Sequence, residues 1–183
     1  MATFEMRSSV VSATDCNNGL GGAQKRSRHK WRCRCRFCIM DIREMKTAFE
    51  IIDHTADVGI IVYGADVKAL FSNAALALFS LITEPESVEE RLDLDLKVSS
   101  EDRDSLLVEW LNELIYCFDV KHVLFNRFHI ESLTDNELKA TCYGEDFDPM
   151  KHKIKIGVKA ATYHMLTLDK NIDGYKAQII LDI

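Results

Sequence analysis

Proline and glycine are scarce in this 183-residue chain, which contains two prolines and eight glycines. Together with 47% hydrophobic and 28% charged residues, this composition is typical of a soluble globular protein and argues against global disorder. Long apolar runs are also missing: no stretch reaches the roughly 18 apolar residues of a membrane-spanning helix, and the N-terminus lacks the apolar segment of a secretory signal. We therefore expect a protein without membrane association, located in the cytoplasm.

Cysteines in the arrangement of a disulfide framework are missing as well. Of the six cysteines, four precede residue 46, and only Cys117 and Cys142 lie in the remainder. This distribution favours a reducing compartment. The spacing Cys33-x-Cys35-x-x-Cys38, with Cys16 or His29 as a fourth ligand, leaves a small zinc site open, although it lacks the two paired knuckles of strong zinc motifs.

Residues 1–45 differ in composition from the rest of the chain. They carry nine Lys/Arg against four Asp/Glu and show no sustained periodicity, which predicts a disordered basic extension before a single domain over residues 46–183. The basic cluster from Lys25 to Arg36 leaves RNA contact, a nuclear signal or a transit peptide open. Translation starting at Met40 or Met45 is an alternative, and it would omit most of this extension.

The predicted domain is strongly acidic. The whole chain has a formal net charge of -6 and the extension contributes +5, so residues 46–183 carry -11. Such a charge repels phosphate backbones and disfavours tight binding of RNA by the domain itself. A basic protein partner fits better.

Apolar periodicity predicts the secondary structure. Leu92, Leu94, Leu96 and Val98 alternate with polar residues, the period of a strand with one buried face. Apolar spacings of three and four residues predict two amphipathic helices, over 67–82 after the capping residue Asp66 and over 106–118. Further strands are predicted at 49–52, 58–63, 123–133, 138–144, 156–168 and 175–183.

These elements predict an α+β fold. Six or seven strands, mostly joined as hairpins, form a largely antiparallel or mixed sheet, and both helices pack against one side of it. The aromatic residues of the helices, such as Phe71, Trp110 and Phe118, are expected in the core.

Three segments contain candidate functional residues. Asp53-His54-Thr55-Ala56-Asp57 offers carboxylates and an imidazole for a cation or a proton, although a local Asx turn explains the same residues. An apolar strand ending on Asp182 and the carboxylate of Ile183 would place two negative charges together, unless it ends in solvent. Lys159 interrupts an apolar run, which also suits a solvated strand face.

Together with Gly144-Glu145-Asp146-Phe147, these segments resemble the archease family over residues 49–183. The resemblance rests on Phe49-Glu50 before the Asp-His-Thr-Ala-Asp segment, on Val158-Lys159-Ala160-Ala161-Thr162-Tyr163 and on the final Asp182-Ile183. It implies that Asp57, Asp182 and Ile183 bind a divalent metal, usually Ca²⁺, with Mg²⁺ or Mn²⁺ as alternatives. It also implies that Lys159 is functionally important. An oxygen-only ligand set suits such a hard cation and not zinc.

The resemblance further implies a function without catalysis by the protein itself. Archeases activate an RtcB-type RNA ligase, promoting its guanylylation and multiple turnover in tRNA splicing and RNA repair, and contact tRNA only through the ligase. Consistent with this, no Gly-rich phosphate loop and no Ser or Cys nucleophile with an evident base occurs in the sequence. A stand-alone metal-dependent enzyme acting on nucleotides or phosphoesters and a chaperone-like scaffold stay open as alternatives.

Overall fold

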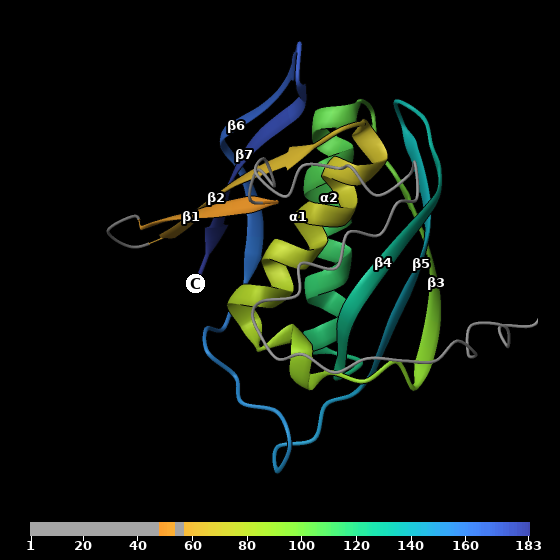
Figure 1. The fold of residues 1–183 in the computed structure, drawn as a ribbon, viewed down its shortest axis with the longest axis vertical. Helices are drawn as coiled ribbons and strands as arrows, with labels where there is room; N and C mark the ends of the chain where they lie inside the picture. The colour runs from red at the N-terminus through yellow and green to blue at the C-terminus, as the bar shows by residue number, and fades with distance from the viewer. Residues whose placement is uncertain (1–47, 54–56) are drawn as a thin grey trace, which may run out of the picture. The chain divides into compact units, whose positions relative to one another are not determined.

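The computed structural model describes residues 48–53 and 57–183 (Figure 1). The predicted basic extension, its cysteine cluster and its methionines lie outside the described residues, as does the centre of the Asp53–Asp57 segment. The boundary at residue 45 therefore stays a prediction.

Four strands form the first antiparallel sheet, in the order β1-β2-β7-β6. Their bounds are Phe49–Asp53 for β1, Asp57–Gly64 for β2, Gly174–Asp182 for β7 and Ala160–Asn171 for β6. β1 and β2 form a hairpin at one edge of this sheet, and β6 and β7 form a hairpin at the other edge. The central pair, β2 and β7, joins strands that are far apart in the sequence. The first and last described segments of the domain are thereby joined.

The second antiparallel sheet contains the remaining three strands, in the order β3-β5-β4. These are β3 (Leu92–Ser99), β5 (Glu137–Asp146) and β4 (Val123–Leu133). The predicted alternation of β3 is confirmed, because its four apolar residues are buried or half-buried and the residues between them are exposed.

Two helices lie between the sheets (Figure 1): α1 spans Val67–Ile82 and α2 spans Arg103–Asp119, with a short 3-10 helix, η1 (Pro85–Ser87), after α1. Helix α1 packs on β2 and β4, and α2 packs on β6 and β3, so each helix contacts both sheets. The predicted cap is confirmed, since the Asp66 carboxylate accepts a hydrogen bond from the Ala69 N–H at 2.8 Å.

The α+β class with two helices and antiparallel strands is confirmed, but the layering differs from the expected single sheet with helices on one side. Helix α1 explains the difference, because its buried residues surround much of its circumference rather than one stripe; they are Leu70, Phe71, Ala74, Ala75, Ala77, Leu78, Phe79, Leu81 and Ile82. A helix that is apolar on opposite faces must be covered from both sides. The second sheet provides that cover.

The expected strand 156–168 begins later, at Ala160. Residues 147–159 instead connect β5 in one sheet to β6 in the other, and they pass the ends of the helices, where the Lys155 N–H donates to the Ile82 carbonyl oxygen at 2.8 Å. Because the two strands belong to different sheets, this segment cannot be a hairpin. Within the described residues, no helix is long and apolar enough to cross a membrane.

Candidate functional site

The first residue of β2 and the last residue of β7 meet at one end of the first sheet. Asp57 is the direct cross-strand partner of Asp182. Side chains of directly opposed residues project from the same face, with Cβ atoms about 4.5–5.5 Å apart. The Asp57 side chain is half-buried and that of Asp182 is exposed, so the pair borders solvent.

The start of β6 completes this corner from the other side of β7. Ala160 pairs with Asp182, and the Lys159 N–H donates to the Asp182 carbonyl oxygen at 2.8 Å. The Lys159 Nζ donates to a main-chain oxygen of Ile183 at 2.9 Å. We call Asp57, Asp182, Ile183 and Lys159 the acidic corner; residues more than 120 positions apart in the sequence share it.

The acidic corner concentrates negative charge. Two carboxylates placed directly opposite each other on neighbouring strands repel each other. Within the described part of the chain, no three His, Cys, Asp or Glu side chains gather closely enough to hold a metal ion. A cation held here would therefore need main-chain oxygens such as that of Ile183 besides the two carboxylates. This donor set contains oxygen alone and fits Ca²⁺ or Mg²⁺.

Helix α2 fixes the strand that leads from the acidic corner. The Asn112 side chain accepts a hydrogen bond from the Ala161 N–H at 2.8 Å and donates one to the Ala161 carbonyl oxygen at 3.3 Å. One turn earlier, the Glu109 carboxylate accepts a hydrogen bond from the Tyr163 hydroxyl at 3.2 Å. Sequence analysis missed Glu109 and Asn112, because their spacing of three residues shows only that they share a face of the helix.

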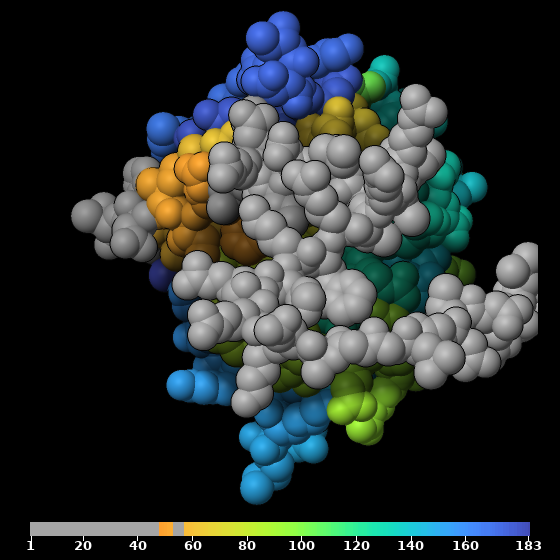
Figure 2. Space-filling view, viewed as in Figure 1, coloured from red at the N-terminus to blue at the C-terminus, as the bar shows by residue number. Residues whose placement is uncertain are grey.

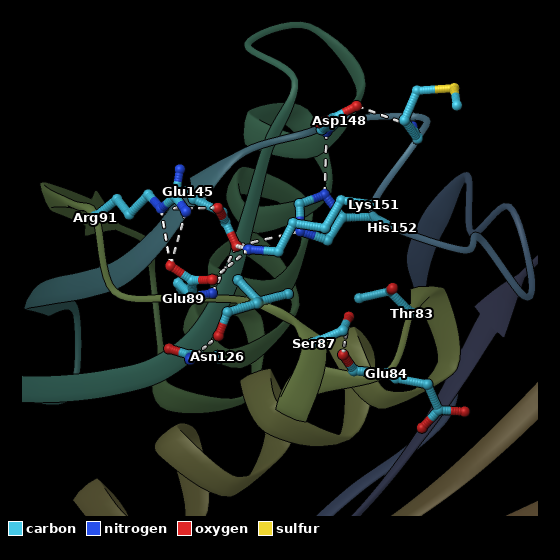
Figure 3. A network of polar contacts seen from close by, with 12 residues as sticks. Thr83, Glu84, Ser87, Glu89, Arg91, Asn126, Glu145, Asp148, Lys151 and His152 are labelled. Atoms are coloured by element: carbon cyan, nitrogen blue, oxygen red, sulfur yellow. Dashed lines mark hydrogen bonds and ion pairs between the residues drawn. The ribbon is translucent and has the colours of Figure 1, made fainter.

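A buried polar network was also missed. Glu145, on β5, is only 5% exposed, and its Oε1 accepts hydrogen bonds from the Glu89 N–H at 2.6 Å and from Lys151 Nζ at 2.6 Å (Figure 3). The Nε2 of buried His152 lies 3.2 Å from the same oxygen, and Arg91 Nε lies 3.5 Å from Oε2. These contacts attach the β5–β6 connection to the end of β5.

The hydrogen bonds of the network define the ionisation of its members. Burial by itself raises the pKa of Glu145, but the Glu89 N–H, Lys151 and His152 outweigh it and lower that pKa from 4.5 to about 2. The His152 Nδ1 accepts a hydrogen bond from the Asp148 N–H at 3.0 Å. An imidazole with its proton on Nε2 therefore satisfies both ring nitrogens, with Nε2 donating to Glu145.

The segment Gly144-Glu145-Asp146-Phe147 thus contributes to the structure of the domain rather than to the acidic corner. A Cβ on Gly144 would lie 1.8 Å from the Leu124 carbonyl oxygen, so only glycine allows this approach of β4 and β5. Phe147 stacks on His152 with ring centroids 6.1 Å apart. The segment anchors the chain that continues to Lys159.

A surface cavity of about 340 Å³ lies at the opposite end of the first sheet. It is lined by Gly64 and Tyr175, which pair with each other at the far ends of the ladder that joins Asp57 to Asp182. None of the predicted site residues lines it. The cavity and the acidic corner are therefore separate features.

The fold and the acidic corner together define an α+β domain in which two antiparallel sheets enclose two helices and two strand ends present paired carboxylates. The chain belongs to the archease family: the model of the Archease protein family (MTH1598/TM1083) matches residues 49–183. The predicted family resemblance is confirmed.

Proteins named archease are similar to about three quarters of the chain. The Protein archease of Methanosarcina mazei is 40% identical over 139 residues, which is 74% of this chain and 95% of the relative. That of Sulfolobus acidocaldarius is 36% identical over 138 residues, 75% of this chain and 99% of the relative.

Solved structures agree on the fold. The solution structure of Methanobacterium thermoautotrophicum protein 1598 is 36% identical, with a TM-score of 0.62, and covers 74% of this chain and 99% of its own. A Thermotoga maritima crystal structure, described as an archease and possible chaperone, is 21% identical with a TM-score of 0.53, covering 73% of this chain and 96% of its own. At that identity it supports the fold alone.

Proposed function

We propose that this protein is a non-enzymatic, metal-binding activator of an RtcB-type RNA ligase that promotes ligase guanylylation and multiple turnover in tRNA splicing and RNA repair. The observation that carries this proposal is the convergence of Asp57, Asp182 and Lys159 at one solvent-facing end of a sheet. Membership in the archease family is the second support.

The acidic corner has the chemistry to enter a basic nucleotide cleft of the ligase. Residues 46–183 carry -11, which attracts a basic protein surface and repels free RNA, so tRNA is contacted through the ligase. Nucleotidyl transfer depends mainly on positioning and charge neutralisation. The Lys159 ammonium, held at the Ile183 oxygen, can be presented to phosphate oxygens in that cleft.

Asp57, Asp182 and the main-chain oxygen of Ile183 would hold the divalent cation, with Ca²⁺ favoured and Mg²⁺ or Mn²⁺ as alternatives. When bound, such a cation supplies positive charge that neutralises and orients phosphate oxygens. The two carboxylates that would hold it stand at the start of β2 and the end of β7. Lys159 donates to the same Ile183 oxygen, so the ammonium limits how that oxygen serves the cation.

Cation binding is tested by thermal unfolding with increasing Ca²⁺. We expect wild-type protein to be stabilised by about 2.7 kcal/mol at a Ca²⁺ concentration 100-fold above the dissociation constant. Asp57→Asn and Asp182→Asn keep the side-chain shape, remove one of the repelling charges and should lose the Ca²⁺ response. Asp173→Asn, in the turn before β7, is the matched control. A response retained by both corner variants would contradict the proposed ligands.

Ligase activation is tested by measuring guanylylation and turnover of an RtcB-type ligase with and without the protein, at defined GTP, Mg²⁺ and Mn²⁺. We expect wild-type protein to accelerate both steps, and Asp57→Ala and Asp182→Ala to abolish the acceleration while the protein stays folded. Unchanged acceleration by either variant would contradict the proposal.

The same experiment separates the alternatives. A stand-alone metal-dependent enzyme would turn over nucleotides or phosphoesters without ligase. A chaperone-like scaffold, the role suggested by the description of the Thermotoga maritima protein, would tolerate loss of both carboxylates.

A further inference from the structure

The edge strand β6 changes register a few residues after the acidic corner. Thr162 pairs with Ile180 and Thr167 pairs with Gln178, so residues 163–166 stand opposite the single residue Ile179 of β7. We call residues 163–166 the β6 bulge. Such bulges redirect side chains away from the regular pleat and are concentrated at sheet edges beside functional sites.

Backbone strain marks the same segment. Met165 has a φ of 52°, the left-handed region that residues other than glycine, asparagine and aspartate rarely occupy. Glycine would adopt this conformation without strain, but the residue at this position is a methionine. A strained methionine that persists at an exposed position indicates a use for its side chain.

Three side chains of the β6 bulge are exposed, whereas the fourth, Leu166, is half-buried and packs against the core. Tyr163 is 55% exposed and Met165 is 51% exposed, and His164 between them is also exposed. An aromatic ring and a flexible thioether are residue types that serve as anchors in protein interfaces. Their burial against a partner would remove apolar surface from water.

Helix α2 fixes the strand segment that joins the acidic corner to the β6 bulge. Asn112 and Glu109 hold Ala161 and Tyr163, the residues between Lys159 and the strained Met165. Asn112 also satisfies both main-chain groups of Ala161 on the open side of the strand. Addition of a partner strand at this point is therefore blocked, and the contact available is through side chains.

The separation of the two features fits a single interface. Along a strand of about 3.3 Å per residue, Met165 lies at most roughly 17 Å from Ala160, the partner of Asp182. A standard protein interface covers about 800 Å² on each side, which is roughly 30 Å across.

The Asp57 and Asp182 side chains project from the face away from the helices, because the adjoining residues Val58 and Leu181 lie in the core. Tyr163 instead contacts helix α2. A partner cleft that encloses this end of the sheet from both faces therefore reaches the β6 bulge.

We propose that the β6 bulge is the apolar anchor by which this protein recognises the ligase, with Met165 and the ring of Tyr163 entering an apolar recess beside the mouth of the ligase's basic cleft. This inference rests on the proposed function. Charge attraction at the acidic corner accelerates encounter, whereas a buried apolar anchor slows dissociation and selects the partner. Substitutions in the acidic corner should therefore slow association, whereas substitutions in the β6 bulge should speed dissociation.

Three variants test the anchor. Met165→Asp tolerates the left-handed backbone but places a charge in the apolar recess. Met165→Gly removes the side chain and relieves the strain, so it should weaken binding while raising thermal stability. Ile172→Asp is the control, because Ile172 is fully exposed in the turn between β6 and β7, at the other end of the same two strands. Figure 2 shows that this hairpin projects from the molecule.

The measurement is the dissociation constant of each variant with the RtcB-type ligase, together with the Ca²⁺ response of the isolated variant. We expect Met165→Asp and Met165→Gly to weaken ligase binding at least about tenfold through faster dissociation, as loss of an interface anchor does. Their Ca²⁺ response should be unchanged, and Ile172→Asp should bind like wild type.

Wild-type affinity in both Met165 variants would overturn the anchor while leaving the proposed function intact, provided that Asp57→Ala still abolishes activation. Equal weakening by Ile172→Asp would also overturn it, since the loss of binding would then not depend on the position of the substitution. A wild-type protein that neither binds nor activates the ligase would overturn the proposed function itself.

Discussion

Replacement of Glu145 by glutamine tests how the buried network holds the β5–β6 connection. The side chain of Glu145 is 6% exposed, and three donors gather on one of its oxygens. Glutamine keeps the shape but turns the charge-assisted hydrogen bonds into weaker neutral ones and leaves Lys151 beside an uncharged amide.

The magnitude follows from the pKa of Glu145, which falls from 4.5 to about 2 on folding. Each pKa unit corresponds to about 1.36 kcal/mol, so the folded protein favours the carboxylate over the acid by roughly 3 kcal/mol. Because the folded pKa is the lower one, this stability is present above pH 4.5 and is lost as the pH falls towards 2. Roughly 1 kcal/mol of it remains at pH 3.

Urea unfolding of wild type and Glu145→Gln at several pH values between 7 and 3 measures this contribution. We expect a difference of roughly 3 kcal/mol at pH 7 that shrinks by more than half at pH 3. Glu137→Gln is the control: its carboxylate, 39% exposed, pairs with Lys97 on the surface, where such pairs contribute little. Equal stability of wild type and Glu145→Gln at pH 7, or a difference that does not change with pH, would refute the reasoning.

Two further predictions concern contacts that position the site. Gly144→Ala should destabilise the domain by about 3 kcal/mol or more, because the new methyl group would meet main-chain atoms of Leu124; urea unfolding measures this, and a loss below about 1 kcal/mol would contradict it. Asn112→Ala should release Ala161 and lower ligase activation more than global stability. Hydrogen exchange of the Ala161 amide should accelerate, and unchanged exchange would show that the Asn112 amide does not hold the strand.

Much of the fold was predictable because its signals are local. The alternation of Leu92 to Val98 and the helical spacing after Asp66 depend on residues that are neighbours in the chain, and both were confirmed. The partition into two sheets was not predicted. It depends on which side of α1 each strand covers. A periodicity shows which residues of an element are apolar, but it does not show which strand packs against them.

The candidate site divides in the same way. Asp57, Lys159, Asp182 and Ile183 were identified by resemblance to a family. The cross-strand register that places Asp57 opposite Asp182 exists only after β2 and β7 have paired. Glu109 and Asn112 read as ordinary polar positions of a helix, and their contacts with Tyr163 and Ala161 required the structure.

The sequence by itself determined the acidic character of the domain, its helices and strands and its family, because composition, periodicity and motifs are properties of the chain. Only the tertiary structure decided that two strand ends and the start of a third form one corner, and that a strained bulge beside it faces solvent. Both depend on pairing between residues far apart in sequence, whose register is selected by burial and main-chain hydrogen bonding across the whole sheet.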